Sequence, residues 1–384
     1  MYWDMAATTP VKPEVLIAMM PYFIDRWYNP SAIYEPAREI RRDIEQARSI
    51  VAESINAEPE EIFFTSGGSE ANIWALNGFR KYIVSNLEHH SIESYMQLLS
   101  TCQVDRNSSV RVVSNDRLGR IVLINLIQLA LTQENPDIVS IQMANNEIGT
   151  IQDIKGLAEI VHESGALFHT DAVQAFGKIL IDVKDLGVDM MSVSGHKIGA
   201  PKGIGFLYIS NKINKGISPL ITGSQEFGLR GGTENVPYII GLAKAVELID
   251  LTEQKCFKEL YDYAVESAKD FATPNGHPEK RLYNILSLTM KDQIDGRILI
   301  GLLHDQGHYV SAGSACNSHS NKPSSVLKAI GLSEDEATRT IRISFSEKTT
   351  KKDVDDLFTA IRQDLELVKM MGVMSSTLPE TVSL

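Results

Sequence analysis

The chain has 384 residues, 43% of them hydrophobic and 22% charged, so it has the composition of a folded protein and the length for two compact domains. Its net charge of −12 and its pI of about 5.3 argue against a nucleic-acid or membrane partner, because no cluster of Lys and Arg offsets the overall negative field. The start shows no signal-peptide pattern and the most apolar run, residues 121–131, is too short to cross a bilayer, so we expect a cytoplasmic protein.

Along the first two thirds of the chain, apolar residues alternate between the periods of helices and of strands. From Ala37 to Val51 they recur every three or four residues, which predicts an amphipathic helix. We expect strands at residues 62–65, 110–113, 138–143, 166–169, 190–193 and 205–209, and helices at 71–84, 121–133, 156–164 and 239–251. This order predicts a mostly parallel, doubly wound α/β domain.

The pattern changes after about Leu251, where a charged helix begins. It is followed by a strand at 284–290, a helix at 295–304, a strand at 340–345 and a closing helix with an apolar stripe from Val354 to Val368. We therefore expect a large α/β domain of residues 12–250. A smaller α+β domain would consist of residues 1–11 and 251–384.

A lysine and an aspartate late in the first domain have the features of a pyridoxal phosphate (PLP) site. Lys197 lies in Ser194-Gly195-His196-Lys197, and Asp171 begins Asp171-Ala172-Val173-Gln174. A lysine amine can form a Schiff base, and the pyridine nitrogen of PLP needs an acidic partner to act as an electron sink. An isolated lysine and aspartate are more often a solvated side chain and a helix cap, so the choice between these roles and a PLP site depends on the neighbouring motifs.

Three further segments bear on such a site. The turn Ser66-Gly67-Gly68-Ser69-Glu70 joins a strand to a helix, where free N–H groups favour a phosphate, and Ser194 and His196 would add donors. Asn145-Asn146-Glu147 follows a strand at the edge where doubly wound sheets bind ligands. His89-His90 fits either a capping role or a ring stacked on a cofactor. None is decisive alone, because turns of this composition are common.

The three cysteines, Cys102, Cys256 and Cys316, are too widely spaced for a disulfide framework or a zinc site, so we expect no metal. Cys316 lies among small polar residues, which favours a reactive thiol on an exposed loop over a core position; the other two keep a structural interpretation. Arg342 alternates with Ile341 and Ile343, so it faces away from them and either holds a substrate carboxylate or lies at the surface.

As an ordered set, these segments resemble the NifS/IscS-type cysteine desulfurases, which are PLP enzymes of fold type I. The resemblance runs from Tyr2 to about Asp364, and its matching stretches are residues 7–10, 29–31, 65–67, 88–89, 145–149, 171–174, 194–197, 232–235 and 313–316. It implies a large PLP-binding α/β domain with a smaller α+β domain that carries the catalytic cysteine loop. It also implies that the enzyme is a homodimer.

The resemblance implies a role for each matching residue. The expected catalytic residues are Lys197 as the Schiff-base lysine, His89 as a ring that stacks on the cofactor and aids proton transfer, and Cys316 as the nucleophile. The cofactor would contact Asp171 at its pyridine nitrogen, Gln174 and Asn146 near its ring hydroxyl, and Gly68, Ser69, Ser194, His196 and the second subunit's Thr233 at its phosphate. The substrate would contact Arg342 through its α-carboxylate, together with Asn146 and Asn29.

The implied reaction converts L-cysteine to L-alanine, with the sulfur carried on Cys316 as a persulfide to an acceptor protein such as an iron–sulfur scaffold. A selenocysteine lyase, or another PLP-dependent lyase or transaminase, would share the Lys197 site, and a non-catalytic sulfur-transfer subunit would keep only the fold. The joint presence of Lys197, Asp171, Gln174 and Cys316 favours the enzyme. The tail beyond Val373 departs from the segment by which IscS-type enzymes dock their scaffold, which leaves the acceptor open.

Overall fold

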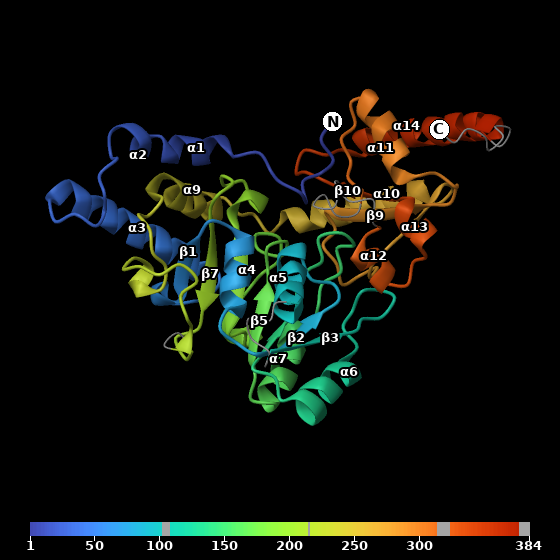
Figure 1. The fold of residues 1–384 in the computed structure, drawn as a ribbon. Coiled ribbons are helices and arrows are strands. Elements are labelled where there is room, and N and C mark those ends of the chain that lie inside the picture. Colours follow the sequence, from blue (N-terminus) through green and yellow to red (C-terminus); the bar gives the residue numbers. More distant parts are fainter. Residues whose placement is uncertain (102–107, 214–215, 313–322, 376–384) are drawn as a thin grey trace, which may run out of the picture.

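A seven-stranded sheet forms the centre of the larger part of the molecule (Figure 1). The structure is a computed structural model that describes residues 1–101, 108–213, 216–312 and 323–375, without the side chains of 132–134 and 371–375. Its order is β1-β7-β6-β5-β4-β2-β3. The strands are β1 Ile62–Thr65, β2 Lys81–Ser85, β3 Ser109–Val113, β4 Ile138–Ser140, β5 Leu167–Asp171, β6 Met190–Ser194 and β7 Gly205–Ile209. Strands β3, β2, β4, β5 and β6 run parallel, whereas β7 is antiparallel to β6 and β1, so the sheet is mostly parallel as expected.

Helices cover both faces of this sheet. They are α1 Pro13–Met19, α2 Pro21–Ile24, α3 Glu35–Glu53, α4 Gly68–Leu76, α5 His90–Thr101, α6 Leu123–Ile127, α7 Ile154–Glu163, α8 Val183–Leu186 and α9 Val236–Glu247. Successive strand residues point to opposite faces. Phe64 therefore packs in a cluster with α3, α7 and α9, whereas its neighbour Phe63 packs with α4 and α5. Burial of both faces explains why these strands are apolar throughout.

A second, antiparallel sheet has its own hydrophobic cluster. Its order is β10-β9-β8, with β8 Ala272–Pro274, β9 Ile285–Met290 and β10 Thr340–Ser344, and the helices of this part are α10 Glu253–Ala268, α11 Gly296–Asp305, α12 Ser325–Ala329, α13 Glu334–Thr338 and α14 Lys351–Ser375. The cluster includes Trp3, Leu288, Ile343 and Leu357, so the N-terminal arm packs with the C-terminal part. The domain boundaries at 11/12 and 250/251 stay a prediction, which the separate clusters support.

Three of the expected helices are wrong in extent. The one expected at 121–133 is α-helical only over Leu123–Ile127 and continues as a π-helix over Gln128–Glu134. The helix expected at 71–84 ends at Leu76, because Gly78 has a φ of +93°, and residues 81–85 form the inner strand β2. The helix expected at 239–251 begins earlier, at Val236, with a proline in its first turn. Within the described residues, no helix combines the length and apolarity that crossing a membrane requires, and no group of His, Cys, Asp and Glu is arranged to hold a metal ion.

A buried ion pair joins α3 to the loop before α9. Arg48 donates to the Glu226 carboxylate through Nη1 at 2.7 Å and Nη2 at 3.0 Å, and both side chains are buried. The same carboxylate accepts from the backbone N–H of Phe64, and the guanidinium lies over the rings of Phe64 and Phe227. Phe227 has a φ of +56°, which is unfavourable for a side chain of this size, so this contact holds a strained turn against β1.

We expect Arg48→Ala to lower the free energy of unfolding by roughly 3–5 kcal/mol, because Glu226 would be left buried without a counter-charge. The control is Arg42→Ala, which removes an exposed ion pair with Glu35 from the same helix and should cost about 1 kcal/mol or less. Urea unfolding of the two variants and the wild type measures both changes. A loss in Arg48→Ala no larger than in the control would contradict the prediction.

Candidate active site

A cavity of about 260 Å³ lies at the carboxyl ends of the parallel strands. Asp171 and Ser194 are the last residues of β5 and β6, and His89 and Gln142 follow β2 and β4. The cavity is lined by Ala6, Ala7, Gly68, Ser69, Asn72, His89, Gln142, Asn146, Asp171, Val173, Gln174, Ser194, His196, Lys197 and Arg342. The fold therefore brings together every residue expected at the cofactor except Thr233.

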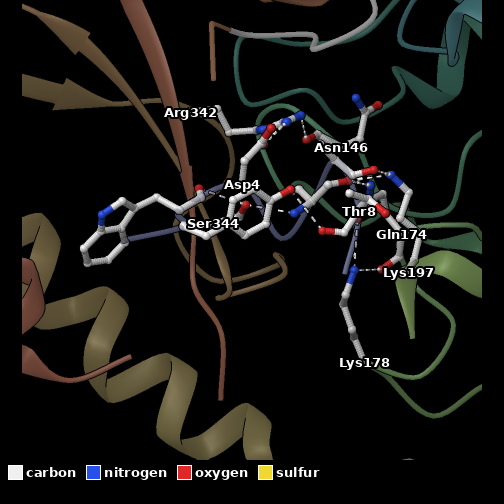
Figure 2. Close-up of polar contacts among 12 residues, drawn as sticks. Asp4, Thr8, Asn146, Gln174, Lys178, Lys197, Arg342 and Ser344 are labelled. Carbon is white, nitrogen blue, oxygen red and sulfur yellow. Dashed lines mark hydrogen bonds and ion pairs between the residues drawn. The ribbon is translucent and has the colours of Figure 1, made fainter. Parts of the chain in front are cut away.

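Lys197 lies in a short turn of residues Gly195–Lys197, directly after β6. Its amine donates to the backbone carbonyls of Ala6 at 2.6 Å and Ala7 at 2.8 Å, both in the N-terminal arm (Figure 2). The turn is tight, because a Cβ on Gly195 would lie 3.0 Å from the side chain of Ala200. The amine is thus held at the cavity wall by two uncharged acceptors.

Asp171 is almost fully buried and is connected to His89 through two intermediate side chains. Its carboxylate accepts from Asn72 Nδ2 at 2.8 Å and from the backbone N–H of Val173 at 2.9 Å. Asn72 Nδ2 also donates to Ser91 Oγ, and the backbone N–H of Ser91 donates to His89 Nδ1 at 3.2 Å. A backbone N–H can only donate, so this contact favours the neutral imidazole with its proton on Nε2.

The N-terminus of α4 forms a cradle at one end of the cavity. A Cβ on Gly68 would lie 2.7 Å from Val173 Cγ2, so only glycine leaves this space open. Ser69 follows Gly68, a Cβ on Gly68 would also lie 3.5 Å from Ser194 Cβ, and His196 lines the same cavity. Burial lowers the pKa of His196 to about 4, and the nearby charge of Lys197 acts in the same direction, so the ring is neutral near pH 7. The cradle thus offers N–H and hydroxyl donors, which suit a phosphate.

These features fit PLP by the chemistry of the donor groups. A lysine amine can hold the aldehyde carbon, the buried carboxylate of Asp171 can face the pyridine nitrogen, and the cradle at Gly68 can hold the phosphate. The three groups come from separate elements of one sheet edge, which is the place where open α/β sheets bind ligands.

Arg342 is buried in β10, so the surface alternative is wrong. Its neighbours Ile341 and Ile343 pack in the second hydrophobic cluster, and the guanidinium faces the cavity on the other side of the strand. Nη1 donates to the Asn146 carbonyl at 2.9 Å and Nη2 pairs with Asp4 at 2.6 Å (Figure 2). Nε is buried and has no partner among the described residues, and Arg342 lines the cavity, where its guanidinium can bind a further carboxylate.

Two expected site residues lie outside the cavity, and two of the three cysteines lie outside the described residues. Asn29 is exposed, and its side-chain oxygen accepts from the Ser31 N–H in a local turn, so this chain does not place it at its own cavity. Thr233 is exposed and also absent from the lining, where a second subunit is expected to supply it. Cys316 and Cys102 lie outside the described residues. Cys256 is exposed on α10, so its structural interpretation is wrong.

Sequence reasoning missed several groups that line or support the cavity. Asn72 lies one helical turn after Gly68, beside the buried Ala71 and Trp74. A polar residue on the buried face of a predicted helix could have indicated a role in the site. Gln142 and Lys178 gave no comparable signal. The arm contributes the carbonyls of Ala6 and Ala7, which no side-chain pattern reveals.

The chain is similar to known proteins over most of its length. The aminotransferase class-V family model matches residues 1–357. The cysteine desulfurase IscS of Methanosarcina thermophila is 39% identical, and the match covers 97% of this chain and 93% of that protein. A NifS-like protein from Rickettsia africae has a solved structure with 31% identity and a TM-score of 0.85, covering 95% of this chain and 99% of that one. The structure of SspA in complex with cysteine has 34% identity and a TM-score of 0.80, with 91% and 99% covered.

The chain therefore belongs to the aminotransferase class-V family, in its branch of NifS/IscS-type cysteine desulfurases. The fold-type-I architecture, the enzyme class of cysteine desulfurase and PLP as the cofactor are thus confirmed.

A buried acid, Glu88, directly precedes His89 and is not used in the contacts above. Its Oε1 accepts from Ser85 Oγ at 2.5 Å and from the Gln142 N–H at 2.8 Å, whereas Oε2 has no partner among the described residues. Burial raises the pKa of Glu88 to about 8, although the two hydrogen bonds oppose this, and the charge of Asp171 adds to the increase. Glu88 is therefore mostly a neutral acid at pH 7.

We expect the wild type to gain stability relative to Glu88→Gln as the pH falls from about 8 towards about 4, because only the folded state holds the Glu88 proton in that interval. The difference in unfolding free energy should change by a few kcal/mol in total, since one pKa unit is worth about 1.4 kcal/mol. Urea unfolding across the pH range measures it, with the exposed Glu60→Gln as the control. A difference that stays flat with pH, as in the control, would refute the raised pKa.

Proposed function

We propose that this protein converts L-cysteine to L-alanine and transfers the sulfur to Cys316 as a persulfide, which it then delivers to an acceptor protein in the cytoplasm. The observation that carries the proposal is the attachment of the described residues on both sides of Cys316. Both attachments are made to the rim of the Lys197 cavity.

The N-terminal attachment is to the strand that carries Arg342. The backbone of Ser311 pairs with that of Arg342 through N–H···O bonds of 3.1 Å and 2.7 Å. Cys316 follows Ser311 by only five residues in the sequence.

The C-terminal attachment is to the turn that carries Asn146. Ser324 caps α12 and donates to Glu147 Oε2 at 2.6 Å, and both side chains are buried. Ser325 donates to Glu93 on α5 at 3.1 Å. A thiol carried between these two anchors is suited to meet a substrate held in the cavity.

The proposed roles follow from the contacts of each residue. Arg342 would bind the α-carboxylate of cysteine, and Lys197 would hold the cofactor through its amine and, with His89, exchange the Cα proton. The bound cofactor supplies the electron sink that makes the substrate sulfur electrophilic. The Cys316 thiolate attacks that sulfur, so an S–S bond forms as the substrate C–S bond breaks. The electron pair stays with the substrate carbon, and a proton completes L-alanine.

The first test compares wild type with Cys316→Ala, both loaded with cofactor, for alanine and sulfide formation from L-cysteine and a reductant. We expect alanine formation to fall by roughly a hundredfold or more, because the group that accepts the sulfur is removed. The control is Cys256→Ala, which removes an exposed thiol and should leave the rate unchanged. Mass spectrometry should find one additional sulfur on Cys316 of the wild type. Equal rates in wild type and Cys316→Ala would point instead to a lyase or transaminase.

We further propose that the enzyme is a homodimer that uses an apolar surface at the start of the chain. This surface consists of Leu16, Ile17, Met20, Phe23, Ile24, Trp27, Ile33 and Tyr34, all exposed, from α1, α2 and the segment before α3. These helices lie at the edge of the molecule away from β8–β10 (Figure 1). Contiguous apolar surface of this kind is typical of protein interfaces. An interface here would accord with a Thr233 that serves a second subunit.

We expect the double variant Ile17→Asp, Ile24→Asp to sediment as a monomer at micromolar concentration, because burying two carboxylates in an apolar interface is costly. Its affinity for the cofactor should fall as well. Met370→Asp, which changes an equally exposed side chain on α14, is the control and should sediment as the wild type does. A double variant that remains dimeric would place the interface elsewhere.

A further inference from the structure

Lys178 is a lysine that contacts the site residue Gln174 and that neither the cofactor nor the substrate needs for a bond. It lies at the end of the turn that follows Asp171, and its amine points back towards Gln174 (Figure 2). Among the described residues no carboxylate pairs with it. A lysine buried in part without a counter-charge is unfavourable, so its retention here calls for a physical explanation.

The turn is built to bring this amine to Gln174. Gly177 has a φ of +75°, and a Cβ there would lie 2.7 Å from Ile198 Cγ2, the residue after Lys197. The backbone N–H of Lys178 closes the turn on the Ala175 carbonyl at 3.0 Å. The side chain then folds back so that Nζ lies 3.0 Å from both the carbonyl oxygen and Oε1 of Gln174.

These contacts determine which way the Gln174 amide faces. A charged Lys178 Nζ can only donate, the Ala6 carbonyl can only accept in either case, and Gln174 Nε2 lies 2.8 Å from that carbonyl. The reversed amide would place two donors against each other and two acceptors against each other. The oxygen is therefore directed at Lys178, and of the side-chain amide only the N–H group remains for the cavity that Gln174 lines.

The bond from Lys178 does not require that it be charged. Loss of hydration lowers the pKa of Lys178 to about 7, and the charges of Lys197 and Arg342 act in the same direction. A neutral amine still carries two N–H bonds, one for each acceptor on Gln174. A second cavity, of about 200 Å³, is lined by both Lys178 and Lys197, so there is space beside the amine.

We propose that Lys178 is a positioning residue: it holds the Gln174 amide with its N–H group towards the cofactor, so that the ring oxygen of the cofactor is bound without its proton. The inference rests on the proposed function only in taking Gln174 as the neighbour of that ring oxygen. An N–H donor stabilises the deprotonated oxygen, which keeps the proton on the nitrogen that joins the cofactor to Lys197. That form absorbs in the visible, whereas the form with a protonated oxygen absorbs in the near ultraviolet.

The test is the ratio of visible to near-ultraviolet absorbance of the cofactor-loaded protein at fixed pH. In Lys178→Met the ratio should fall roughly two- to tenfold, the range expected for loss of one ordinary hydrogen bond. Lys178→Arg keeps N–H donors, has the second cavity to extend into, and should restore most of the ratio. The matched control is Lys12→Met, which removes from the same second cavity a lysine whose amine donates to the Leu248 carbonyl. Its ratio should equal that of the wild type.

A Gln174→Leu background separates orientation of the amide from a simple effect of charge. If Lys178 acts through Gln174, Lys178→Met makes no further change to the ratio in that background. An equal decrease in both backgrounds, or an unchanged ratio in Lys178→Met alone, would overturn the proposal. Unfolding of the cofactor-free variants confirms that each is folded. The absorbance does not depend on turnover, so a wild type that binds cofactor without making alanine from cysteine would contradict the proposed function and still test this one.

Discussion

The position of Lys197 depends on the hydrogen bonds that its amine donates to a segment almost two hundred residues earlier in the chain. The carbonyls of Ala6 and Ala7 hold Lys197, and Asp4 of the same arm pairs with Arg342 (Figure 2). The arm is itself fixed at β10, where Ser344 donates from its backbone to Trp3 and accepts from the Ala6 N–H. One extended segment therefore sets the spacing between the group proposed for the substrate carboxylate and the group proposed for the cofactor aldehyde.

The fold could be predicted from the sequence wherever the period of apolar residues was clear. The run from Ala37 to Val51 correctly predicted helix α3. The apolar runs at 62–65 and 205–209 predicted strands β1 and β7 with the correct bounds. The prediction failed where tertiary burial overrides local pattern. Residues 81–85 continue a helical pattern but form β2, because they occupy an inner position of the sheet with parallel neighbours on both sides.

The site residues could be predicted from the sequence where their own side chains would react with or bind the cofactor or the substrate. Lys197 and Asp171 were assigned by their types and motifs, Gln174 and Arg342 by the family resemblance, and the cavity brings all four together. The residues that were missed act by supporting others. Asn72 holds Asp171, Lys178 holds Gln174, and two alanines contribute only backbone carbonyls. Such roles depend on distances between elements, which sequence spacing does not encode.

The arm also affects the order in which the structure can be completed during synthesis. Trp3 is buried against residues that include Ile343 and Leu357, and these are translated near the end of the chain. A nascent chain can build the seven-stranded sheet from residues 62–209 before these partners leave the ribosome. Until then, Asp4 has no Arg342 and Ala6 has no Ser344 to hold it. The residues made first therefore gain part of their contacts only after the end of the chain has been made.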